Sequence, residues 1–145
     1  IGLDDFISAM NEKARQLGMN FSTFIDPSGL NAGNVSSVGD LYTLVRYINE
    51  QRSFIFDITD TSRVSTDYVS GEFGELVNFN HIENVDSFVG GKVGETNAAG
   101  QTSISLHKLQ IQGEERLVVV ILLGSDDRSQ DVQVLLDHVN ESFSN

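Results

Sequence analysis

A single lysine among glycines is the feature of this sequence that most suggests chemistry. Residues 90–100 read Gly-Gly-Lys-Val-Gly-Glu-Thr-Asn-Ala-Ala-Gly, so Lys92 lies between Gly91 and Gly94. Glycines let a backbone approach a ligand closely, and a lysine on a strand edge attracts an anion. The pattern favours an anion site at this edge. The alternative is a tight turn with a solvated lysine.

Two amphipathic helices are expected to precede this segment. Apolar residues at three- and four-residue spacing predict the first over 3–17, with Gly18 as its C-terminal cap. The second begins near Ser37, which has the capping-box spacing to Asp40. A further short turn of helix is expected over 53–59. These helices are interpreted as core elements that carry no chemistry.

The second half of the chain predicts strands. Residues 64–69 and 76–82 form a hairpin candidate. Three longer strands with short links form an antiparallel meander, and a final helix follows; these elements cover 88–96, 102–111, 116–123 and 131–143. The continuous apolar run 118–123 is typical of a strand buried on both faces. Together the elements predict one α+β domain over 1–145.

Composition excludes several classes of function. The net charge is -12 and only nine residues are Lys or Arg, so the chain is not expected to bind nucleic acid. No cysteine is present, and His81, His107 and His138 lack metal-ligand spacing. Neither a metal nor a cofactor is therefore predicted.

The order of short motifs resembles the D-alanyl-D-alanine carboxypeptidases, the low-molecular-mass penicillin-binding proteins. The similarity covers nearly the whole chain and is strongest at Gly91–Thr96 followed by Ala98–Gly100. The other matching segments are Phe6–Ala14, Leu17–Met19, Phe24–Asn31, Ser36–Leu41 and Asn78–Asn80. The resemblance implies part of a penicillin-binding-protein or β-lactamase-like transpeptidase fold. It also implies an extracytoplasmic location in a bacterium.

Members of this family perform acyl transfer through a serine ester, using Ser-x-x-Lys, Ser-x-Asn and Lys-Thr-Gly motifs. The sequence departs from that pattern. No Ser-x-Asn occurs, and the one Ser-x-x-Lys, Ser105–Lys108, falls in an expected strand, where residues three apart face opposite sides. The third motif reads Lys-Val-Gly, so Val93 replaces a threonine and lacks its hydroxyl. The chain is therefore expected to be inactive alone.

The resemblance implies roles for residues near Lys92 and for one strand edge. Lys92 is the expected catalytic-site cation for a peptidoglycan stem peptide or a β-lactam, and four neighbours are expected to bind substrate: Gly91, Val93, Gly94 and Thr96. Two alternatives remain: a non-catalytic relative that binds peptidoglycan peptides or a protein, and a ligand-free scaffold. The family's sheet has two further strands, so Arg116–Leu123 is expected to have a bare apolar edge that self-associates or pairs with a missing segment.

Overall fold

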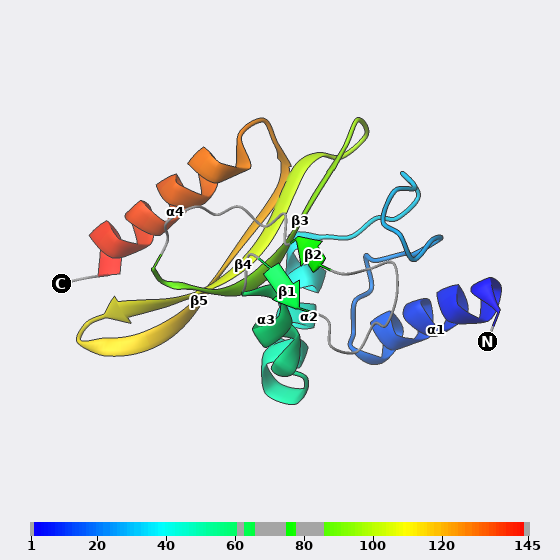
Figure 1. The fold of residues 1–145 in the computed structure, drawn as a ribbon, viewed down its shortest axis with the longest axis horizontal. Helices are drawn as coiled ribbons and strands as arrows, with labels where there is room; N and C mark the ends of the chain where they lie inside the picture. The colour runs from blue at the N-terminus through cyan, green and yellow to red at the C-terminus, as the bar shows by residue number, and fades with distance from the viewer. Residues whose placement is uncertain (1, 61–62, 66–74, 78–85, 144–145) are drawn as a thin grey trace.

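The computed structural model describes residues 2–60, 63–65, 75–77 and 86–143. Helices come first in the described chain, strands follow, and a helix ends it (Figure 1). In chain order they are α1 (Leu3–Gln16), α2 (Val38–Gln51), α3 (Phe54–Thr59), β1 (Arg63–Ser65), β2 (Glu75–Val77), β3 (Phe88–Thr96), β4 (Gly100–Ile111), β5 (Glu114–Ser125) and α4 (Arg128–Phe143). The predicted α+β class is confirmed.

The central sheet is the antiparallel meander that the sequence predicts, in the order β3–β4–β5. Lys92 pairs with Ile104 and Val93 with Ser103, in unbroken register from Gly91 to Thr96. β1 and β2 form a separate small antiparallel pair. The link predicted between them, 71–74, and the segment 78–81 lie outside the described residues. Within the described chain, β3 and β5 are therefore the two edges of the sheet.

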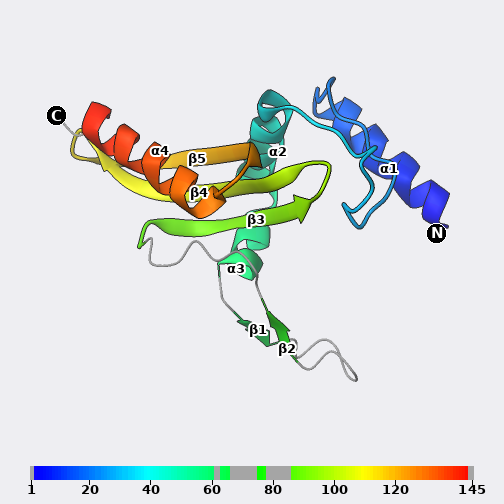
Figure 2. The same ribbon diagram turned by 90° about the horizontal axis from the view of Figure 1, so that it is seen from above.

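Helices cover both faces of this sheet. On one face α4 packs over Leu109 and Val120 through Val132 and Leu136. On the other face Leu106 packs against Val45 of α2 and Phe56 of α3. Figure 2 shows α4 and α2 on opposite sides of the strands, with α1 apart from them. This sandwich leaves the two sheet edges as the places where the backbone remains accessible.

The apolar run in β5 is explained by this arrangement. Val118, Val120 and Leu122 face α4, whereas Val119 faces α2 and α3. However, Val120 is the one buried residue of β5, and Leu117, just before the run, and Leu123, at its end, are 48% and 46% exposed. The expectation of burial on both faces is therefore wrong in degree, because an edge strand is open on one side.

Local signals set the helix ends. Ser37 Oγ accepts the backbone N–H of Asp40 at 3.2 Å, which confirms the expected N-cap of α2. Gly18 has φ +80°, the left-handed conformation of a C-terminal cap, directly after the C-cap of α1. The final helix begins at Arg128, three residues before its predicted start. Because of this earlier start, the cationic residue Arg128 is part of the helix.

Candidate functional site

The outer edge of β3 presents Lys92 to solvent. Lys92 is exposed, and its Nζ donates to the carbonyl oxygen of its neighbour Val93. Because the register is regular here, Lys92 and Thr96 lie on the same face of β3. No described strand pairs with β3 on this side. A ligand strand therefore has access to the edge from Lys92 onward.

The two glycines before Lys92 serve the packing of α3. A Cβ on Gly90 would lie 2.8 Å from Thr59 Oγ1 and 3.0 Å from the carbonyl oxygen of Phe56. The N–H of Gly91 donates to Thr59 Oγ1 at 3.2 Å. The sequence interpretation assigned Gly91 to substrate binding, but the structure places it under α3. The open part of the edge begins at Lys92.

Val93 lies in the core layer on the α4 face. It is 9% exposed and pairs directly with Ser103, which is 1% exposed. Ser103 Oγ has no hydrogen-bond partner, and it is the one buried oxygen or nitrogen of this kind among the described side chains. Opposite residues of an antiparallel pair have Cβ atoms about 5 Å apart. A hydroxyl at position 93 would therefore lie within reach of Ser103 Oγ.

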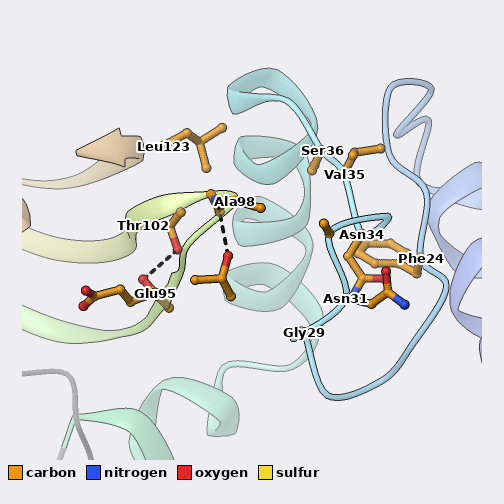
Figure 3. Close-up of a pocket in the computed structure, with 14 residues that line it drawn as sticks. Phe24, Gly29, Asn31, Asn34, Val35, Ser36, Glu95, Ala98, Thr102 and Leu123 are labelled. Atoms are coloured by element: carbon orange, nitrogen blue, oxygen red, sulfur yellow. Dashed lines mark hydrogen bonds between the residues drawn. The ribbon is translucent and has the colours of Figure 1, made fainter. Parts of the chain in front are cut away.

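Two adjoining clefts separate β3 from the loop that joins α1 to α2. The first, of about 400 Å³, lies between residues 94–99 of the sheet and loop residues 29–36. The second, of about 490 Å³, includes Lys92 and loop residues 26–30. Figure 3 shows Phe24, Asn31 and Asn34 on the loop side, with Thr102 and Glu95 contributed by the sheet. Thr96 lines both clefts, and its Oγ1 accepts the N–H of Ala99 at 3.1 Å.

The loop wall is held rigid by a hydrogen-bond network around Asp26. Its Oδ1 accepts the N–H of Gly29 and its Oδ2 accepts that of Asn31, both at 2.7 Å. Asn34 Oδ1 in turn accepts the N–H of Ile25 at 2.7 Å. Partial desolvation raises the pKa of Asp26, but these N–H donors and its side-chain partners outweigh it and lower that pKa. The carboxylate therefore stays ionised and preserves the loop.

Arg128 is a site residue that the sequence interpretation missed. Its Nη1 lies 3.5 Å from the carbonyl oxygen of Gly94 and 3.5 Å from Glu95 Oε2. Gln101 Oε1 accepts the backbone N–H of Arg128 at 3.0 Å and holds the helix start against the hairpin. The sequence signal that could have located the start of α4 was Asp127. Its Oδ1 accepts the N–H of Gln130 at 3.0 Å, which is a helix-start pattern.

The one Ser-x-x-Lys of the chain is not a catalytic pair. Ser105 is fully buried, and hydrogen bonds join His107 Nε2 to Ser105 Oγ at 2.8 Å and His107 Nδ1 to Ser87 Oγ at 3.1 Å. Lys108 is exposed on the opposite face, with its Nζ 3.7 Å from Glu115 Oε1. Alternation along β4 separates the two groups, as the sequence predicts.

Neither a metal cluster nor a membrane span emerges from the described part of the chain. No group of three or more His, Asp or Glu side chains there is arranged to hold a metal ion. No described helix is long and apolar enough to cross a membrane. Lys92 and Arg128 are two cations that lie along the open half of β3.

Comparisons with known proteins agree on the class of fold and on the family. The chain is similar to penicillin-binding protein D2 of Listeria monocytogenes in its cefotaxime-bound form, with 28% identity and a TM-score of 0.78 over 92% of this chain and 54% of that one. The sequence profile of the D-alanyl-D-alanine carboxypeptidases matches residues 2–126. The fold is thus a partial penicillin-binding-protein fold. The chain belongs to the D-alanyl-D-alanine carboxypeptidase family.

Two curated relatives are D-alanyl-D-alanine endopeptidases. That of Escherichia coli is 35% identical over 102 residues, which are 68% of this chain and 33% of the relative. That of Haemophilus influenzae is 39% identical over 85 residues, which are 58% of this chain and 26% of the relative. The chain therefore spans about a third or less of the length of these relatives and about half of the Listeria protein.

Proposed function

We propose that this chain supplies the cationic strand edge of a serine acyl-transfer site that acts on D-Ala-D-Ala peptides of peptidoglycan. The observation that carries the proposal is the open half of β3, where Lys92 is followed by Gly94 and flanked by Arg128. The ammonium of Lys92, which lines the second cleft, suits the terminal carboxylate of such a peptide or of a β-lactam. The family membership supports the reaction class. The site lies on the extracytoplasmic side of a bacterial membrane.

Backbone groups complete the proposed role of this edge. The N–H of Gly91 points outward to Thr59, so alternation directs the N–H groups of Val93 and Glu95 to the same outer side. A ligand in extended conformation adds to such an edge by main-chain hydrogen bonds. An outward N–H also suits the oxyanion that develops during acyl transfer. Lys92 stabilises the same negative charge from the loop side.

The nucleophile in this proposal comes from a serine-bearing segment outside the present sequence. The edge of β5 is the place for it, because exposed Leu117 and Leu123 flank that edge. A shallow apolar groove of about 320 Å³ runs between Tyr42 of α2, residues 118–121 of β5 and Leu135 of α4. An uncovered apolar edge strand pairs readily with another strand. Without that segment the chain is inactive and self-associates through β5.

The test of the proposed reaction uses the longest natural form that contains this chain. Penicillin is expected to leave a covalent acyl adduct, detected by intact-protein mass spectrometry, and Lys92→Ala to slow its formation. Lys108→Ala is the matched control, since Lys108 is an exposed lysine of the same sheet. Equal acylation rates in the parent and in Lys92→Ala would refute the role of Lys92.

A non-catalytic role is the second candidate, and Val93 favours it. Val93 is buried opposite Ser103 and lacks the hydroxyl of the Lys-Thr-Gly motif that the family's enzymes carry at this position. In that case the chain binds peptidoglycan peptides or a protein through the same edge. No natural form would then give an acyl adduct, although the peptides would still bind.

The β5 contact is tested separately with the 145-residue chain. Light scattering is expected to give a mass above that of the 15.9 kDa monomer. Leu117→Lys places a charge on the free edge and is expected to restore the monomer. A monomeric parent with rapid exchange of the β5 amide protons would contradict the pairing.

A further inference from the structure

A chain of polar side chains runs from buried Asp40, in the first turn of α2, to the wall of the first cleft. Asp40 is 6% exposed, and its Oδ2 accepts hydrogen bonds from the N–H of Phe21 and from Ser22 Oγ, both at 2.7 Å. Ser22 Oγ lies 2.7 Å from Ser36 Oγ. Figure 3 shows Ser36 and Val35 on the loop side of the first cleft, which both residues line. The chain therefore connects a buried carboxylate with the cleft.

The direction of these hydrogen bonds follows from the hydrogens that each group carries. A carboxylate only accepts, and a hydroxyl has one hydrogen to donate. Ser22 donates its hydrogen to Asp40, so the hydrogen between the two serines comes from Ser36. Among the described residues, no other hydrogen bond reaches Ser36 Oγ. Ser36 therefore offers a ligand lone pairs and no hydrogen.

The sheet side of the first cleft offers a second acceptor and one donor. Thr102 Oγ1 donates its hydrogen to the carbonyl oxygen of Gly94 at 3.2 Å. A Cβ on Gly94 would lie 3.0 Å from Thr102 Oγ1, so the glycine leaves room for this contact. Thr96 Oγ1 instead accepts the N–H of Ala99, and within the described chain its own hydrogen has no acceptor. The cleft thus combines two acceptors with one hydroxyl that can donate.

An uncharged amide group matches this set of partners. Its N–H requires an acceptor and its carbonyl oxygen requires a donor, and leaving either one unpaired would weaken binding. Glu95 is the one charged residue among those that line the first cleft, and it pairs with Arg128 at 3.5 Å. The apolar side chains of the cleft, which suit the methyl groups beside an amide, include Phe24, Val35, Ala98 and Leu123.

We infer that the first cleft is a binding site for an uncharged peptide amide, with Ser36 Oγ accepting its N–H and Thr96 Oγ1 donating to its carbonyl oxygen. Asp40 is a positioning residue of this site, because it takes the hydrogen of Ser22 and thereby fixes the direction of the Ser36 hydroxyl. The inference goes beyond the proposed function, which rests on Lys92 in the second cleft. Since Thr96 lines both clefts, a peptide held in the second cleft can extend into this site.

Two uncharged probes test the inference with the 145-residue chain. Nα-acetyl-D-alanine methylamide carries an amide N–H where Nα-acetyl-D-alanine methyl ester carries an oxygen, and neither probe has a carboxylate. Dissociation constants come from NMR titrations followed at the backbone signals of residues 34–36 and 94–99. The parent is expected to bind the methylamide about two- to tenfold more tightly than the ester, the size of one neutral hydrogen bond.

Three serine variants separate the acceptor from the rest of the fold. Ser36→Ala removes the acceptor and is expected to bring the ratio of the two constants close to one. Ser22→Ala keeps Ser36 but frees its hydrogen, so the ratio should fall although no side chain that lines the first cleft is changed. Ser8→Ala is the matched control, because Ser8 is an exposed serine of α1 that lines neither cleft; it should keep the parental ratio.

Equal affinities in the parent, signal shifts confined to residues outside the first cleft, or an unchanged ratio in Ser36→Ala would overturn the inference. An unchanged ratio in Ser22→Ala would overturn the role assigned to Asp40. The probes have no carboxylate for Lys92 to hold, so none of these outcomes bears on the proposed function, which penicillin acylation tests.

Discussion

The buried His107 makes the stability of this domain depend on pH in a way that can be measured. Its side chain is fully buried, and its two ring nitrogens are hydrogen-bonded to Ser105 and Ser87. Its ring packs edge-on against Phe88, with the ring centroids 5.8 Å apart. Burial lowers the pKa of His107 from 6.5 to about 4. The folded chain therefore keeps the imidazole neutral under conditions in which the unfolded chain protonates it.

The sign and size of the effect follow from that difference. Below pH 6.5 the unfolded state gains a proton that the folded state accepts only near pH 4. The free energy of unfolding consequently falls as pH decreases through this window, by roughly 3 kcal/mol in total. Above pH 6.5 His107 contributes no pH dependence. Carboxylates add their own loss below about pH 5, so the parent must be compared with a variant.

Urea unfolding of the parent and of His107→Gln between pH 4 and pH 8 measures this contribution. The variant loses stability at pH 8, but the difference between the two proteins should shrink as the pH decreases. Val120→Ala is the control, because it removes core packing and keeps the imidazole; its curve should run parallel to the parent's. An NMR titration of the His107 ring with a midpoint near 6.5 would refute the reasoning.

Three further substitutions test the site geometry. Val93→Thr offers a partner to the orphan Ser103 Oγ and should raise the free energy of unfolding by about 0.5–1.5 kcal/mol in urea; a loss would contradict that pairing. Gly90→Ala forces a Cβ against the Phe56 backbone and should cost about 1–3 kcal/mol, seen as a lower Tm; an unchanged Tm would contradict the close approach of α3. Asn34→Ala frees the loop wall and should speed proteolysis there while leaving Tm within a few degrees; unchanged cleavage would count against the network.

Much of the fold could be predicted because its signals are local. The helix over 3–17 is observed as α1 and the strand over 88–96 as β3, since hydrophobic periodicity depends on neighbouring residues alone. Boundaries were less accurate: the strand expected over 116–123 extends to 114–125. The backbone hydrogen bonds between β4 and β5 continue past the apolar run. Polar residues at the ends of that run are therefore also part of the strand.

The site could be predicted only in part. Lys92 was identified from its glycine context, and its position on an open edge agrees with that interpretation. The contact of Gly91 with α3 could not be predicted from the sequence, because α3 approaches from 32 residues earlier in the chain. The proximity of Arg128 to Gly94, 34 residues away, was inaccessible for the same reason.

By itself the sequence determined most of the helices and strands, that its one Ser-x-x-Lys falls in a strand, and that one lysine lies among glycines. The tertiary structure alone decided which backbone groups remain open, which hydroxyl is left unpaired at Ser103, and that Arg128 lies beside Gly94 and Glu95. The physical reason is that secondary structure depends on near neighbours, whereas burial and electrostatics depend on segments that only folding brings together.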